Sequence, residues 1–167
     1  MNFSIEKLKY FLELAIEEAQ QAMKNDNYPI GSIIVNDIGD VLVSGQNENT
    51  TLNDITAHAE IQCMRKLGLK KLSKNLGQNN YLITSMEPCL GCGFFIARTN
   101  IKQVIWAADD SYKPGLRIGH DLPLISPSFE KLEFISELFE ELKIKSKHLM
   151  YKYLMKKGRV ELAKYYS

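Results

Sequence analysis

Residues 56–60 read Thr-Ala-His-Ala-Glu, and residues 87–92 read Glu-Pro-Cys-Leu-Gly-Cys. The two stretches together offer three side chains that bind zinc well, His58, Cys89 and Cys92, and a separate carboxylate at Glu60. Three protein ligands leave one corner of a zinc tetrahedron open to water, whereas a structural zinc site has four. The spacing therefore predicts a catalytic Zn²⁺ site at the starts of two helices, next to the ends of strands in an α/β fold.

The Pro-Cys-x-x-Cys stretch alone is also found in redox pairs and in structural zinc sites. A structural site would need a fourth ligand, for which Cys63 is the obvious candidate. Cys63 follows His58 by five residues on the same predicted helix, and five residues turn a helix by about 140°. We therefore expect Cys63 to be a small buried side chain outside the metal site.

Glu60 is the predicted general base. A zinc ion held by two thiolates and a neutral imidazole has no net charge, so it is a mild Lewis acid and its water needs a base. Glu60 could take that proton and hand it to a leaving group. The alternative is that this carboxylate only caps the start of its helix.

Length, charge and cysteine content narrow the class of protein. With 167 residues and a formal net charge of +1, we expect a single domain over residues 1–167 and find no sign of a polyanion partner. Three cysteines, two of them in the metal motif, do not make a disulfide framework, which favours a cytoplasmic location. No apolar run approaches the roughly 20 residues that span a bilayer, so we expect no membrane contact.

Hydrophobic periodicity predicts alternating helices and strands. A helix begins at Ser4, a hairpin follows, and later strands and helices alternate as in βαβ crossovers. The segment 109–127 contains several prolines and glycines and is expected to be irregular. The expected helices are 4–25, 57–67, 88–99 and 138–156, the expected strands are 30–36, 41–46, 81–85, 103–107 and 132–136, and 47–55 and 70–80 are expected loops.

From Pro29 to Ala108 the chain resembles the cytidine deaminase superfamily, in the branch of guanine deaminases, yeast-type cytosine deaminases and tRNA adenosine deaminases. His-x-Glu followed by Pro-Cys-x-x-Cys is the signature of zinc-dependent deaminases. The resemblance implies a three-layer α/β/α sandwich around a five-stranded mixed sheet. It also implies that zinc-bound hydroxide attacks an amino-substituted ring, that ammonia is released, and that the chain forms a homodimer.

Within this branch, residues 45–60 and 84–89 are most similar to bacterial guanine deaminase. This similarity implies that the substrate is a small purine or pyrimidine, with conversion of guanine to xanthine and ammonia as the main hypothesis. It further implies that Asn47 hydrogen-bonds the substrate ring, and that backbone groups at Ala57 and Ser85 line the pocket. Asn47 could instead serve only the turn that follows its strand.

Guanine deaminases also resemble one another in a second acidic proton shuttle and in a C-terminal segment that closes the partner's active site. Asp121 is the candidate shuttle, with Asp109 and Asp110 as alternatives. Tyr165 and Tyr166 could supply the closing segment. The chain departs from the family pattern because an isoleucine precedes Thr-Ala-His where proline is usual, and because 109–127 does not match well.

Two alternatives of the same chemistry remain, a tRNA adenosine (A-to-I) deaminase and a cytosine or cytidine deaminase. A tRNA substrate would use basic side chains, which cluster at 66–74 and 143–159. Because the net charge is near zero, we expect these basic clusters to be ordinary solvent-exposed faces and not a tRNA-binding surface. A tRNA is therefore the less favoured partner. An alternative of another class is a catalytically silent, zinc-stabilised binding module.

Overall fold

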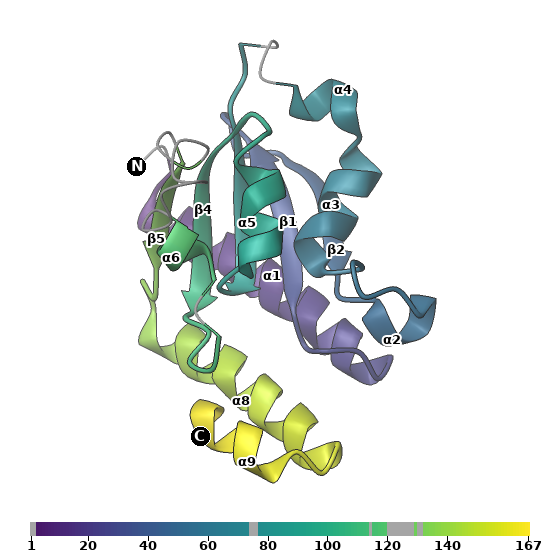
Figure 1. Ribbon diagram of the computed structural model, residues 1–167. Coiled ribbons are helices and arrows are strands. Elements are labelled where there is room, and N and C mark those ends of the chain that lie inside the picture. The colour runs from purple at the N-terminus through teal and green to yellow at the C-terminus, as the bar shows by residue number, and fades with distance from the viewer. Residues whose placement is uncertain (1–2, 74–76, 114, 120–128, 130–131) are drawn as a thin grey trace.

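The protein is described by a computed structural model that covers residues 3–73, 77–113, 115–119, 129 and 132–167 (Figure 1). Five strands form one mixed sheet in the order β2-β1-β3-β4-β5. β1 is antiparallel to both of its neighbours, whereas β4 is parallel to β3 and to β5. The strands are β1 Gly31–Asn36, β2 Val41–Gln46, β3 Asn80–Met86, β4 Ile101–Ala108 and β5 Glu133–Ser136.

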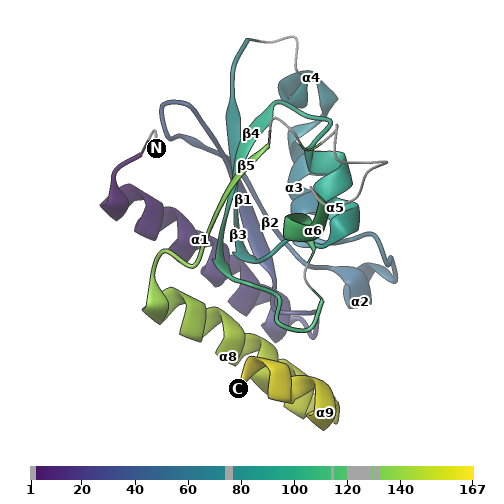
Figure 2. The same cartoon turned by 60° about the vertical axis from the view of Figure 1, so that its left-hand side comes forward.

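Helices cover both faces of the sheet, which confirms the predicted α/β/α sandwich (Figure 2). α1 (Ile5–Lys24) and α8 (Glu140–Lys156) lie on one face. α3 (Ala59–Leu67) and α5 (Leu90–Ile96) lie on the other face. Shorter helical segments are α2 Asn49–Leu52, α4 Leu69–Leu72, α6 Leu116–Gly119, α9 Val160–Ala163 and the 3₁₀ turn η2 Lys164–Tyr166.

The alternation of side chains along β1 divides the core into two layers. Ile33 and Val35 pack in the apolar cluster that includes α1, whereas Ile34 packs in the cluster that includes Cys92 and Ile96 of α5. All five side chains are buried. Burying an aliphatic side chain of this size contributes about 1.5–3 kcal/mol, so the sheet fixes both helical layers and the position of α5.

Several predicted elements differ in their bounds. α5 begins at Leu90 instead of Pro88, because Cys89 has an extended backbone and is the N-cap residue. α2 lies in the expected loop 47–55, α4 overlaps the start of the expected loop 70–80, and α6 lies in the segment expected to be irregular. One turn of helix is too short to produce a hydrophobic period, so sequence patterns did not indicate these elements.

The C-terminal part agrees with the predicted strand and helix. β5 and α8 fall within the expected ranges 132–136 and 138–156. Gly158 then has φ of +70°, which a glycine adopts without strain, and it separates α8 from the unpredicted α9. None of the described helices is both long and apolar enough to cross a membrane.

Candidate metal centre

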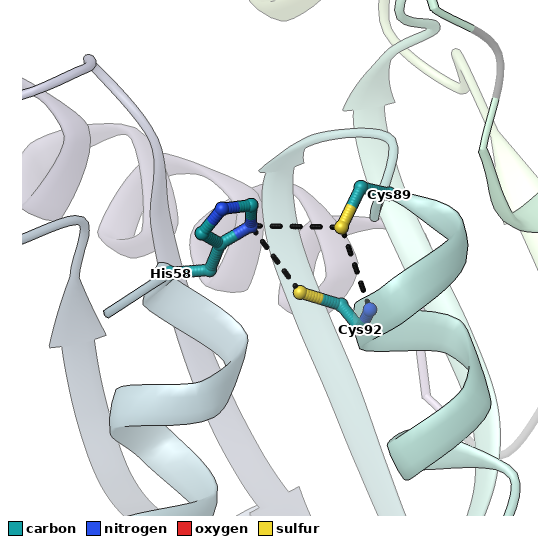
Figure 3. A group of neighbouring side chains, drawn as sticks. All are labelled: His58, Cys89 and Cys92. Carbon is teal, nitrogen blue, oxygen red and sulfur yellow. Dashed lines mark hydrogen bonds between the residues drawn. The ribbon is translucent and has the colours of Figure 1, made fainter. Parts of the chain in front are cut away.

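The three predicted ligands come from the N-terminal ends of α3 and α5, the two helices on the same face of the sheet (Figure 3). His58 is the N-cap residue of α3 and Cys89 is the N-cap residue of α5. Cys92 lies in the first turn of α5, where its backbone N–H donates to Cys89 Sγ at 3.4 Å. The N-terminal ends of helices favour negative charge, so both sulfurs lie where a thiolate is stabilised.

The distances within this group fit a zinc ion. His58 Nδ1 lies 3.6 Å from Cys89 Sγ and 3.4 Å from Cys92 Sγ, and the three atoms all lie within 4.8 Å of one another. In a tetrahedron with the usual Zn–N and Zn–S bond lengths, nitrogen and sulfur ligands are about 3.6 Å apart. His58, Cys89 and Cys92 could therefore hold zinc with little movement of the backbone.

The neighbours of Cys89 favour its thiolate form. Hydrogen bonds from the Cys92 thiol and from His58 lower the pKa of Cys89 to about 4, against the effect of burial. The hydrogen bond to Cys89 in turn raises the pKa of His58. Because the thiolate is the form that binds metal, one of the two sulfurs is ready to bind at neutral pH.

Glu60 adjoins the three residues but lies deeper in the protein. It sits in the first turn of α3, is 2% exposed, and its Oε2 is 3.6 Å from Cys92 Sγ. Burial, followed by the negative charge of Cys89, raises the pKa of the Glu60 carboxyl. A raised pKa makes the Glu60 carboxylate a stronger base than an ordinary glutamate, which suits a group that accepts a proton.

Cys63 lies outside this group, as predicted. Its side chain is fully buried, and Sγ donates a hydrogen bond to the Ser32 carbonyl oxygen at 3.2 Å. Burial raises the pKa of this thiol. Within the described ranges, the group of side chains placed to hold a metal consists of His58, Cys89 and Cys92.

A cavity of about 860 Å³ opens onto His58, Cys89 and Glu60. Asn47 lines it and is 2% exposed, but its amide also donates to Asn49 Oδ1 at 2.5 Å. Ala57 and Ser85 are buried and are not among the cavity-lining residues. The Ala57 carbonyl accepts from Glu48 N, and the Ser85 carbonyl accepts from Ser146 Oγ, so their contact with a substrate stays a prediction.

The candidate second proton shuttle, Asp121, lies outside the described residues. Of the two alternatives, Asp110 lines the cavity and accepts a hydrogen bond from the Tyr166 hydroxyl at 2.6 Å. Asp109 accepts from Trp106 Nε1 and pairs with Arg117, both at 2.7 Å. Asp109 is therefore held in a structural network, and Asp110 is the alternative that faces the cavity.

Some residues of the cavity were not predicted. Glu87 lines the cavity beside Cys89. This glutamate was quoted from the sequence as part of the Glu-Pro-Cys stretch, but no role was assigned to it. Leu162, also not predicted, forms part of the wall together with Tyr166, which was predicted to belong to a closing segment. Tyr166 reaches Asp110 of its own chain, whereas the resemblance to guanine deaminases implied closure of a partner's site. In the sequence, the pair Tyr165 and Tyr166 was the feature that could have indicated this part of the cavity wall.

Comparisons with known proteins agree with this geometry. Residues 5–108 match the family model of the cytidine and deoxycytidylate deaminase zinc-binding region. The tRNA-specific adenosine deaminase of Aquifex aeolicus is 28% identical over 146 residues, which are 81% of this chain and 95% of that protein.

Two solved structures of deaminases are also similar to this chain. One, from a study of A-to-I editing by tRNA:A34 deaminases, has a TM-score of 0.69 and 30% identity, and covers 84% of this chain and 99% of its own. The guanine deaminase of Bacillus subtilis has a TM-score of 0.53 and 37% identity, and covers 60% of this chain and 64% of its own. Because the family model matches more than half of its length, the chain belongs to the family defined by the cytidine and deoxycytidylate deaminase zinc-binding region and is an enzyme that hydrolyses C–N bonds.

Proposed function

We propose that this enzyme deaminates adenosine to inosine in a tRNA anticodon. The reaction class is carried by one arrangement, three side chains that would hold a metal ion with the buried Glu60 carboxylate next to them. The substrate is supported by the relatives, because the Aquifex aeolicus protein and the structure with a TM-score of 0.69 are both tRNA adenosine deaminases. The tRNA substrate, which was an alternative in the sequence analysis, is therefore better supported than guanine, which was the main hypothesis.

His58, Cys89 and Cys92 would hold the zinc ion, and Glu60 would move the protons. Zinc, when bound, lowers the pKa of a water molecule and so supplies a nucleophile near neutral pH. Glu60 would accept a proton from that water, hold it in its buried position, and deliver it to the leaving amine. Asn47 would orient the ring at the cavity wall, and Asp110 is the described candidate for a second proton shuttle.

Two cations among the charged residues that line the cavity could contact the phosphates of a tRNA substrate. Lys113 and Arg159 line the cavity, and neither is ion-paired to a carboxylate of the described residues. Arg159 Nη1 donates to the Tyr28 hydroxyl at 2.5 Å, and Lys113 Nζ lies 5.3 Å from the centre of the Tyr112 ring. Cations of this kind contact the phosphates of a nucleic acid without reading its sequence.

Guanine is the second candidate substrate. The Bacillus subtilis guanine deaminase is 37% identical to this chain over the part that aligns. The wall formed by Tyr166 would also suit a small ring that is enclosed by the protein. A silent binding module is less well supported, because such a module has no need of a buried carboxylate at Glu60. The homodimer and the cytoplasmic location stay predictions.

Ammonia release from a panel of substrates tests this proposal. Zinc-loaded protein would be incubated with a tRNA anticodon arm that carries adenosine, a matched arm with guanosine at that position, free guanine, cytosine, adenosine and cytidine. We expect ammonia and one inosine per molecule from the adenosine arm alone. Turnover of free guanine without turnover of the arm would identify the second candidate, and no release from any substrate would support the binding module.

A further inference from the structure

Glu87 is a carboxylate buried directly before Pro88 and the proposed zinc ligand Cys89. Its side chain is 0% exposed. Oε1 accepts hydrogen bonds from the backbone N–H groups of Gly115 at 3.0 Å and Arg117 at 3.1 Å. Oε2 accepts one from the N–H of Asp110 at 3.3 Å. A buried charge without partners is very unfavourable, so the segment that follows β4 folds around this carboxylate.

Arg117 supplies the charge that balances Glu87. Its Nε and Nη2 lie 3.0 and 2.9 Å from Glu87 Oε2. Its Nη1 lies 2.7 Å from Asp109 Oδ2, and the other oxygen of Asp109 accepts from Trp106 Nε1 at 2.7 Å. One guanidinium therefore links Glu87, at the end of β3, to Asp109, which follows β4. A lysine could not make these contacts together, because it lacks the planar fork of donors.

The same segment rests on the backbone of the proposed ligand. Leu116 N–H donates to the Pro88 carbonyl oxygen at 2.9 Å. A Cβ atom placed on Gly115 would lie 2.2 Å from that oxygen and 2.7 Å from Cys89 Cα. The chain at Gly115 is thus in direct contact with Cys89, and a displacement of this segment would move the cysteine backbone.

We propose that Arg117 is a positioning residue of the metal centre. By pairing with Glu87 and Asp109, it holds the segment after β4 against Pro88 and Cys89, and so fixes both the direction of Cys89 Sγ and the cavity wall at Asp110. The inference rests on the proposed function for the identity of the ligands. Partners that surround metal ligands typically change metal affinity by about 10- to 100-fold when they are removed.

The test compares Arg117→Met and Arg117→Lys with the parent protein. Cobalt substituted for zinc gives visible absorption bands that depend on the geometry of the thiolate ligands, and a chelator competition gives the zinc dissociation constant. We expect Arg117→Met to shift the cobalt bands and weaken zinc binding by about 10- to 100-fold. Arg117→Lys should fall between this variant and the parent, since it keeps the charge without the fork.

Two further variants separate positioning from stability. Lys102→Met is the control, because it removes an exposed ion pair between Lys102 in β4 and Glu133. We expect this variant to have the cobalt spectrum and the zinc affinity of the parent protein. If Arg117→Met does not fold, the double variant Glu87→Gln/Arg117→Met replaces it, because removing both charges leaves no buried charge unpaired. We expect the same change in the cobalt bands and in zinc affinity from this double variant. A folded variant with parent cobalt bands and zinc affinity within twofold would overturn the proposal, even if its Tm were lower. Neither the cobalt spectrum nor the zinc dissociation constant depends on turnover. The result would therefore hold even if the proposed substrate were wrong.

Discussion

The Glu60→Gln variant is expected to keep its zinc and to lose about 10²- to 10⁴-fold in kcat. Glutamine has nearly the same size as the buried Glu60 and can still accept a hydrogen bond, so the metal site should remain assembled. It cannot accept the proton of the attacking water or deliver one to the leaving amine. The loss should therefore appear in kcat more strongly than in KM.

Steady-state kinetics on the preferred substrate, together with zinc content by elemental analysis, measure this effect. Glu141→Gln is a matched control, because it removes an exposed carboxylate that pairs with Lys9 at 2.7 Å and does not line the cavity. The control should retain parental kcat. A zinc-replete Glu60→Gln enzyme with kcat within threefold of the parent would exclude the role of this residue as proton carrier.

The Cys89→Ser variant is expected to lose zinc and, with it, all measurable turnover. A serine hydroxyl is a poor ligand for zinc compared with a thiolate. Because zinc binds the folded chain, its loss should also lower stability, by about 4 kcal/mol where free zinc had been a thousandfold above Kd. For a domain of this size, that corresponds to a fall in Tm of roughly 8–16 °C.

Cys63→Ser is the matched control for this substitution. It changes the same atoms at a buried site, and its hydroxyl can still donate to the Ser32 carbonyl oxygen. We expect one zinc per chain and parental turnover from this control, measured by elemental analysis and by ammonia release. Retention of stoichiometric zinc by Cys89→Ser, or its loss from Cys63→Ser, would show that the ligands are wrongly assigned.

Much of the fold could be predicted from local patterns. The apolar stripe of α1 and the runs that became β1 and β2 have clear periods, and a capping serine marks the start of α1. The strand β5 and helix α8 were also predicted. Long or strongly patterned segments are predictable because their own sequence determines which face is buried.

The metal residues could be predicted for a different reason. His58, Cys89 and Cys92 belong to short motifs whose spacing places ligands at helix starts. The role of Arg117 could not be predicted, because it depends on a contact with Glu87, 30 positions earlier in the chain. The approach of Tyr166 to Asp110 spans 56 positions and likewise depends on the packing of α8 and α9. Contacts of this kind follow from tertiary structure, which no local period encodes.

X-ray absorption spectroscopy at the zinc edge tests the central claim, an open site with three protein ligands, most directly. For the zinc-loaded protein without substrate, we expect two sulfur ligands at about 2.3 Å and two nitrogen or oxygen ligands at about 2.0–2.1 Å. One of the lighter ligands would be His58, and the other would be a water molecule in the fourth position. A third sulfur would mean that Cys63 closes the site, and it would contradict the account.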